Sequence, residues 1–248
     1  MKRRNAIKQS IAAATSVSLP TIIPSSVLGN EAPSKKITIG MIGTGNHGIH
    51  RNLNMFLRQP DARVLAVCDV FKSRMRKAQG ITDRHYGKNG CTQHADFREI
   101  LERDDIDAVM ISTPDHWHTL MSAMAIRRGK DVICEKPTLT IAEGRFLSDL
   151  VKKSGKVFQT STEDRSLFVY HRLAEAVRNG RIGKLEKIKV TLPAGQRFPN
   201  EKSTTPPNDL DYELWLGPAP YAPYTKNRTE RQHWRHVWDY SGGKFSDW

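Results

Sequence analysis

The sequence predicts a doubly wound α/β domain, in which helices cover both faces of a parallel sheet. Two observations predict it: short runs rich in Val and Ile alternate with segments of helical spacing from residue 35 to 162, and those segments are long enough to cross between parallel strands. A tail rich in Trp, Tyr and Pro follows, so we assign residues 163–248 to the start of a second domain.

Five strands are expected in the first domain. Each is a short, nearly continuous apolar run, as parallel strands buried on both faces require. The runs are 35–43, 63–70, 107–113, 131–137 and 156–162. A sixth strand, residues 185–193, is expected in the second domain.

Helices are expected between these strands. The first stops at Pro60, Asp96 is placed to cap the third, and Thr140 with Glu143 forms a capping-box pattern for the fifth. The expected helices are 46–59, 71–87, 96–103, 118–129, 140–155 and, after the sheet, 167–183.

The N-terminus has the pattern of a secretory signal. A basic cluster that includes Arg3 and Arg4 precedes an apolar, small-residue stretch at 11–23, and small and polar residues surround Gly29. The two arginines resemble a twin-arginine export signal, although Ala6 stands where a bulky apolar residue is usual. We expect residues 1–34 to be a signal peptide and linker and the protein to be periplasmic or otherwise exported, without stable membrane insertion after cleavage. A membrane anchor or a Sec signal is the alternative.

Composition and charge argue against a disordered chain and against a nucleic-acid-binding protein. The chain has 248 residues, 38% of them hydrophobic, and a net charge of +13 that is spread along the sequence rather than gathered in one basic block. We therefore expect a globular protein with no nucleic-acid partner. Its three cysteines lack metal-ligand spacing, and Cys68 and Cys134 lie in apolar runs as small buried side chains.

A glycine-rich turn follows the first expected strand and opens the first expected helix. It reads Gly43-Thr44-Gly45-Asn46-His47-Gly48. In this pattern the first glycine allows a tight turn, the second lets the backbone approach a pyrophosphate, and the third lets helix and strand pack closely. The helix N-terminus then presents unpaired N–H groups to the phosphates. We expect these six residues to bind a dinucleotide.

An acidic residue ends the next strand. Asp69 follows Gly48 by 21 residues, where a carboxylate can accept hydrogen bonds from the adenosine ribose. It would repel a 2′-phosphate, so NAD is favoured. Lys72 and Arg74 lie close by and leave NADP open.

Two further motifs follow strands and should face the same crevice, because ligands bind at the carboxyl ends of parallel strands. The first, residues 112–118, reads STPDHWH. We expect four of its residues to line the nicotinamide pocket: Ser112, Thr113, Pro114 and His118. His116 and His118 could form a metal site, but no carboxylate–histidine set at helical spacing supports one. The alternative to a pocket lining is a helix N-terminus capped by Asp115 or Thr113.

The second motif is Glu135-Lys136-Pro137. Pro137 favours an extended conformation at Lys136. Because neighbouring side chains on a strand point to opposite sides, we expect that Glu135 and Lys136 do not both face the pocket. A lysine beside the nicotinamide could hydrogen-bond or help deprotonate a substrate hydroxyl as hydride leaves. Lys136 is therefore a candidate catalytic residue, and Glu135 and Lys136 are candidate cofactor-binding residues. A solvated loop lysine is the alternative.

This order of motifs resembles the Gfo/Idh/MocA oxidoreductases, which are sugar and polyol dehydrogenases. The resemblance covers residues 35–248, and Glu-Lys-Pro is its most specific element. It implies a Rossmann domain that binds NAD or NADP, then an α+β domain with a mostly antiparallel open sheet that holds the substrate and often mediates homo-oligomers. It also implies that Lys136 is the active-site lysine and that Arg165 lies near the nicotinamide.

The resemblance further implies a longer protein. The segment that ends at Trp248 resembles the family segment leading into a glycine, a histidine and an aspartate that usually complete the catalytic set. We expect the chain to be an N-terminal fragment or truncated product, with weak or no hydride transfer on its own.

Three functional hypotheses follow. The first is an exported NAD(P)-dependent oxidoreductase of a sugar or polyol. The second is a glycoside hydrolase that retains NAD, and the third is a non-catalytic NAD-binding module. An oxidised sugar or a hydrolysed glycoside as product distinguishes the first two.

Overall fold

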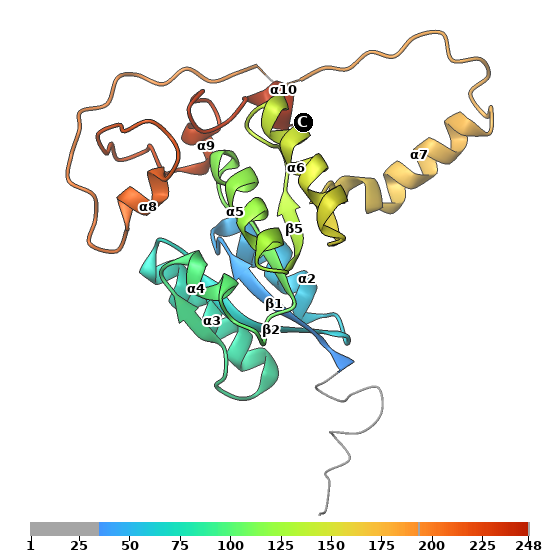
Figure 1. Cartoon of the computed structure of the whole chain (residues 1–248). Coiled ribbons are helices and arrows are strands. Elements are labelled where there is room, and N and C mark those ends of the chain that lie inside the picture. Colours follow the sequence, from blue (N-terminus) through green and yellow to red (C-terminus); the bar gives the residue numbers. More distant parts are fainter. Residues whose placement is uncertain (1–34, 193, 248) are drawn as a thin grey trace, which may run out of the picture. The chain divides into compact units, whose positions relative to one another are not determined.

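Six parallel strands form one sheet in the computed structural model of the protein, which describes residues 35–192 and 194–247 (Figure 1). The strands are β1 Ile37–Ile42, β2 Ala62–Cys68, β3 Thr92–His94, β4 Ala108–Ile111, β5 Asp131–Glu135 and β6 Phe158–Ser161. Their order in the sheet is β3-β2-β1-β4-β5-β6. The chain thus reverses its direction of winding between β1 and β4, and this switch point is where a doubly wound sheet binds ligands.

Helices connect the strands and continue after the sheet. They are the π-helix η4 Gly48–Leu53, α2 Asn54–Leu57, α3 Lys72–Tyr86, α4 Phe97–Leu101, α5 Asp115–Arg127, α6 Ile141–Ser154, the 3₁₀-helix η5 Glu163–Ser166, α7 Phe168–Arg178, α8 Tyr212–Leu216, α9 Arg231–Trp234 and α10 Lys244–Asp247. The predicted helix at 46–59 is thus two elements, and its first turns, beside the glycine-rich turn, have π geometry.

Two hydrophobic clusters lie on opposite faces of the sheet. Alternate residues of β4 show the division: Val109 and Ile111 pack in the cluster with α4, α5 and α6, whereas Met110 packs in the cluster with η4, α2 and α3. Burial of both faces explains why the strands read as continuous apolar runs. The doubly wound sheet predicted from the sequence is confirmed.

Local signals set several helix ends. The Asp96 side chain accepts a hydrogen bond from the backbone of Arg98, and both bonds of the Thr140–Glu143 capping box are present. The prediction for α5 was wrong by three residues, since it begins at Asp115, with Pro114 as its N-cap and no side-chain cap. Thr113 and Asp115 therefore do not cap this helix.

Two strand predictions need correction. Strand β3 was not predicted, because its sequence Thr-Gln-His is short and polar. The predicted strand at 185–193 was wrong for the residues described: 185–192 have no regular structure, and Ile188 is 72% exposed. A strand needs a hydrogen-bonding neighbour, and in the described part of the chain this segment pairs with none.

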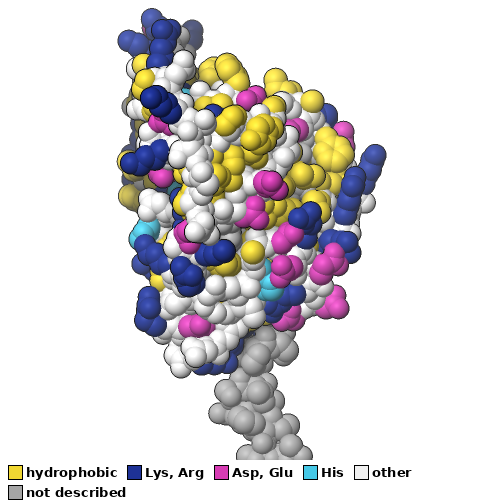
Figure 2. Space-filling view, turned by 90° about the vertical axis from the view of Figure 1, so that its left-hand side faces the viewer, with side chains coloured by type: hydrophobic (Ala, Val, Ile, Leu, Met, Phe, Trp, Pro, Cys, Tyr) yellow, Lys and Arg dark blue, Asp and Glu magenta, His cyan; other side chains and the backbone are white. Residues whose placement is uncertain are grey.

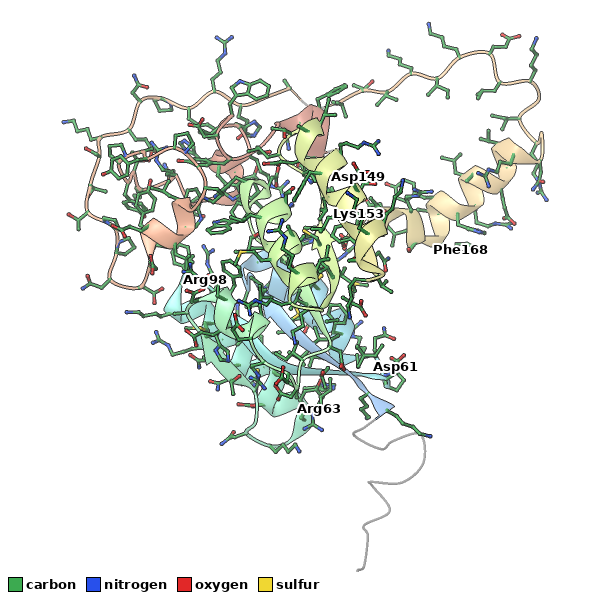
Figure 3. The ribbon with its side chains drawn as sticks, viewed as in Figure 1. Asp61, Arg63, Arg98, Asp149, Lys153 and Phe168 are labelled. Carbon is green, nitrogen blue, oxygen red and sulfur yellow. The ribbon has the colours of Figure 1, made fainter. Side chains whose placement is uncertain are left out.

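The C-terminal segment packs through aromatic side chains. A third cluster contains Leu210, Tyr212, Trp215, Leu216, Trp234 and Tyr240, and it contacts Val70 and Phe71 after β2. Residues from Ile37 onward form one compact unit. Helix α7 differs, because it buries none of its residues and Phe168, labelled in Figure 3, is 78% exposed.

Figure 2 shows the side that carries α8, on which Lys and Arg side chains are interspersed with Asp and Glu rather than forming one basic surface. Cys68, Cys91 and Cys134 are free and buried, which confirms the expectation for the two in strands. Among the residues described, no helix has both the length and the apolar character needed to cross a membrane. The predicted signal peptide lies outside the described residues.

Candidate functional site

A cavity of about 270 Å³ lies at the carboxyl ends of the strands. Twelve of the fourteen residues predicted from the sequence line it: Gly43, Gly45, Asn46, His47, Gly48, Asp69, Ser112, Thr113, Pro114, His118, Glu135 and Lys136. The topology thus brings together the ends of β1, β2, β4 and β5, as expected for a switch-point site.

The glycine-rich turn is constrained at its first and last glycines. Gly43 has φ of 88°, and a Cβ there would lie 2.6 Å from the carbonyl group of Ser112. A Cβ on Gly48 would lie 2.2 Å from the Gly43 carbonyl oxygen. At Gly45 the nearest atom to a Cβ would be 3.7 Å away, on Arg74, so this glycine leaves the backbone open toward the cavity. The turn therefore has the shape that a pyrophosphate requires.

Asp69 fixes this turn to the end of β2. Its Oδ2 accepts a hydrogen bond from the backbone N–H of Thr44 at 2.6 Å, and its Oδ1 accepts one from the N–H of Phe71 at 2.9 Å. Burial raises the pKa of Asp69, although Arg74 and these hydrogen bonds oppose that effect. Thr44 is buried beneath the turn and does not line the cavity. The predicted ribose contact of Asp69 stays a prediction.

Glu135 receives two side-chain hydrogen bonds at the end of β5. Its Oε1 lies 3.0 Å from His47 Nε2 and 2.9 Å from Asn52 Nδ2, and Asn52 also donates to Ser112 Oγ at 2.8 Å. Burial raises the pKa of Glu135, but these hydrogen bonds outweigh it, so the net pKa is lowered and the carboxylate stays charged. Asn52 was not predicted from the sequence, although its place one helical turn after Gly48 was a signal.

His47, Glu135 and Glu163 bring three potential ligand atoms within 4.8 Å of one another. Arg51 forms an ion pair with Glu163 at 3.1 Å, and this positive charge opposes a cation at the same place. The cluster therefore acts here as a polar network that holds Glu135 at the cavity.

Lys136 is held by a carboxylate from the far end of the chain. Its Nζ lies 2.9 Å from Asp247 Oδ1, and Asp247 also pairs with Arg235. Burial raises the pKa of Asp247, but hydrogen bonds from Lys136 and Arg235 lower it and dominate. The side chain of Asp247 is 6% exposed and that of Lys136 is 35% exposed, so the carboxylate is buried while the lysine remains partly open to solvent. Asp247 was not predicted as a site residue, because its partner Lys136 lies 111 residues earlier in the sequence.

Glu135 and Lys136 both line the cavity, so the prediction that one of them would face away was wrong. Strand β5 ends at Glu135, and the alternation of side chains ends with it. Glu135 bonds to the glycine-turn side of the cavity, whereas Lys136 bonds to α10.

His118 joins the loops that follow β4 and β5. Its Nδ1 lies 2.7 Å from the Pro137 carbonyl oxygen, and its Nε2 lies 2.9 Å from that of Thr113. Because both carbonyls are acceptors, both contacts are hydrogen bonds when each ring nitrogen carries a proton. His116 points elsewhere, toward the carbonyl of Trp215, so the two histidines do not form a metal pair.

Two regions differ from the sequence prediction. Arg165 is exposed on η5 and lines a separate cavity with Glu163 and Arg51. The main cavity also has a wall that was not predicted, from the C-terminal segment: Leu214, Trp215, Thr229, Glu230, Arg231, Trp234 and Arg235. Their signal was compositional, since this part of the sequence is rich in aromatic and basic residues.

Two family models match the chain. An oxidoreductase family with an NAD-binding Rossmann fold matches residues 37–162, and the C-terminal alpha/beta domain of an oxidoreductase family matches residues 192–248. The first match covers the sheet and its strand-end motifs. The second covers the segment that closes the cavity.

Individual relatives match over part of the chain. A glycosyl hydrolase family 109 protein of Saccharopolyspora erythraea is 37% identical over 123 residues, which are 48% of this chain and 26% of that protein. A myo-inositol 2-dehydrogenase from Lactobacillus plantarum superposes with a TM-score of 0.55 at 25% identity, over 60% of this chain and 43% of that one. A 3-ketoreductase from Actinomadura kijaniata, solved with NADP and TDP-benzene, gives 0.52 at 25%, over 58% and 43%. The chain spans between 25% and 47% of the curated relatives compared.

Proposed function

The chain belongs to the Gfo/Idh/MocA oxidoreductase family, whose NAD-binding model covers residues 37–162, and we propose that it functions as an NAD(P)-dependent oxidoreductase that acts on a sugar or polyol. A bound nicotinamide ring would accept or supply the hydride. The observation that carries the proposal is that the glycine turn and the Lys136–Asp247 pair line or contact one cavity.

The residues present fit a dinucleotide. The open backbone at Gly45 and the N–H groups of the turn provide the phosphate site, and Asp69 holds the turn in place. The four strand ends then position the turn and Lys136 around the same space. The similarity to a myo-inositol 2-dehydrogenase and to a dTDP-3,4-didehydro-2,6-dideoxy-alpha-D-glucose 3-reductase of Streptomyces antibioticus supports a sugar or polyol as substrate class.

Lys136 and Asp247 would handle the proton of the substrate hydroxyl. In the oxidative direction the amine of Lys136 takes the hydroxyl proton as hydride leaves the carbon, and the Asp247 carboxylate, which stays ionised, holds the ammonium that forms. In the reductive direction the ammonium of Lys136 gives a proton to the carbonyl oxygen. Glu135 stays ionised beside His47 and Asn52 and positions the glycine turn against the end of β5.

The test of cofactor binding uses the full chain and tryptophan fluorescence titrated with NADH and NADPH. Gly45→Ala adds a methyl group where the structure is open, so we expect a folded protein with at least about tenfold weaker binding. Gly90→Ala is the matched control, since a Cβ there meets nothing within 4 Å and Gly90 lies away from the cavity. Equal affinity of the two variants, or no binding by the wild type, would contradict the proposal.

The reaction is tested by product analysis. Because the chain spans less than half of its curated relatives, the assay uses the full-length gene product that contains it. Incubation of that protein with NAD and a panel of sugars, polyols and glycosides should give an oxidised sugar with equal amounts of NADH. Release of a free aglycone without net NADH would point instead to a hydrolase that retains its cofactor.

Export is a separate part of the proposal. It is supported by the basic cluster with Arg3 and Arg4 before an apolar stretch. Fractionation of cells that express the chain should find it outside the cytoplasm, and replacement of both arginines by lysine should leave it inside. Export of the double variant would contradict a twin-arginine route.

A further inference from the structure

We propose that residues 209–216 form a clasp over the adenosine end of the cofactor crevice and slow both entry and release of the dinucleotide. The inference rests on the proposed dinucleotide site. It goes beyond that site because it assigns a kinetic role to a segment outside the glycine turn and the strand-end motifs.

The first attachment of the clasp is a helix cap from a distant part of the chain. The N-cap residue of α3, Phe71, supplies no side-chain cap. Asp209, 136 residues after Ser73, does so instead: its Oδ1 accepts from the Ser73 backbone N–H at 2.9 Å, and its Oδ2 accepts from Ser73 Oγ. The Lys72 N–H also donates to the Asp209 carbonyl at 2.9 Å. A residue of the clasp thus caps the first turn of α3.

Backbone pairing extends this attachment toward the cavity. Phe71 and Leu210 form an antiparallel bridge, and the Asp211 N–H donates to the Val70 carbonyl at 2.9 Å. Asp211 then caps α8 by accepting from the Leu214 N–H. The clasp therefore runs along the loop that directly follows Asp69.

The second attachment lies across the crevice, on α5. The Trp215 carbonyl accepts from His116 Nε2 at 3.0 Å and from Trp117 Nε1 at 3.1 Å. The clasp is therefore tied on one side to the loop after β2 and on the other to the helix after β4. A segment tied at both sides spans the space between those strand ends.

The adenosine of a dinucleotide bound at the glycine turn would lie under this segment. In doubly wound sheets the acidic residue that ends the second strand marks the adenosine ribose. Here Asp69 lines the same cavity as four residues from the loop after β2, from α3 and from the clasp: Val70, Arg74, Leu214 and Trp215. Arg74 lies over the Phe71 ring, 3.8 Å from its centroid, and so is held at this end. Release of the cofactor then requires the clasp to open.

The test is a stopped-flow measurement on the full chain of NADH binding, and of NADH release into excess NAD. Asp209→Ala removes the side-chain cap of α3. The loss of one helix cap corresponds to about a fivefold change in an equilibrium or rate constant, so we expect both rate constants to rise by about fivefold while Kd changes little. Thr140→Ala is the matched control, because it removes a side-chain cap from α6, which does not line the cavity. It should lower stability without changing either rate.

The outcomes separate the clasp from the dinucleotide site. If the wild type binds no dinucleotide, the proposed function is wrong. If it binds but Asp209→Ala leaves both rates unchanged, or Thr140→Ala raises them equally, the clasp is wrong. Should Asp209→Ala fail to fold, Ser73→Ala gives the answer, since it removes one hydrogen bond and should raise both rates by a smaller factor.

Discussion

The sheet and the C-terminal segment contribute to one cavity but are held in different ways. Residues 37–161 pair through backbone ladders and bury two apolar clusters. Residues 209–247 dock on them mainly through caps, aromatic packing and ion pairs, after an exposed stretch without regular structure. The glycine turn therefore lies in the part that the sheet and its two clusters hold together. Asp247, the partner of Lys136, lies in the part that is attached through fewer contacts.

The largest expected effect is a loss of turnover without a loss of cofactor binding. Lys136→Met should lower turnover by about 10²–10⁴-fold, because it removes the group placed for proton transfer, while NADH affinity stays within about twofold. Steady-state kinetics and fluorescence titration check this. Lys152→Met, on the last turn of α6 away from the cavity, should leave both unchanged. Turnover retained in the first variant would remove Lys136 from the mechanism.

The same substitution, Ile→Ala, compares the stability contributed by the buried sheet with that contributed by the exposed stretch. Ile111→Ala, at a fully buried position on β4, should lower the free energy of unfolding by about 2–5 kcal/mol. Ile188→Ala, in the exposed stretch, should change it by less than about 0.5 kcal/mol. Urea unfolding measures both. Similar losses would mean that the exposed stretch is packed in solution.

Low pH should loosen the contact between the two regions through His116. Burial against the C-terminal segment lowers the pKa of His116 from 6.5 to about 4. The unfolded chain therefore takes up a proton between pH 6.5 and 4 while the folded chain does not, so stability should fall by up to about 3 kcal/mol across that window and level off below it. Above pH 6.5 this group contributes nothing.

His116→Gln keeps an N–H donor for the Trp215 carbonyl and cannot titrate in this range, so it should remove that part of the pH dependence. The same change at His85, which is exposed, should leave the profile as in the wild type. Thermal unfolding at pH 4–7 measures the effect. An unaltered profile in His116→Gln would assign the pH dependence to other groups.

Most of the first domain could be predicted from the sequence, because burial on two faces leaves a strong pattern. The runs that became β1, β2, β4, β5 and β6 are continuous and apolar, and the capping box at Thr140 is local. Strand β3 escaped because three polar residues at a sheet edge have no such pattern. The opposite error, at 185–192, arose because an apolar pattern does not supply a pairing partner.

Site residues that directly follow a strand could be predicted from the sequence. Residues whose partners are distant in the sequence were missed. The glycine turn, Asp69 and Lys136 are read from their place after strands. Asp247 and Asp209 act 111 and 136 residues from their partners, and such pairings depend on tertiary packing. Glu135 and Lys136 show a smaller limit, since a strand's alternation does not apply past its last residue.

The separation of Lys136 from Asp247 has a consequence for biosynthesis. The ribosome adds Asp247 111 residues after the lysine, so a nascent chain contains the whole phosphate-binding turn long before the carboxylate that pairs with the amine exists. The sheet and its glycine turn are therefore complete in the nascent chain before the lysine acquires its partner. A polypeptide interrupted between Ser161 and Asp247 would contain the whole sheet and lack the carboxylate.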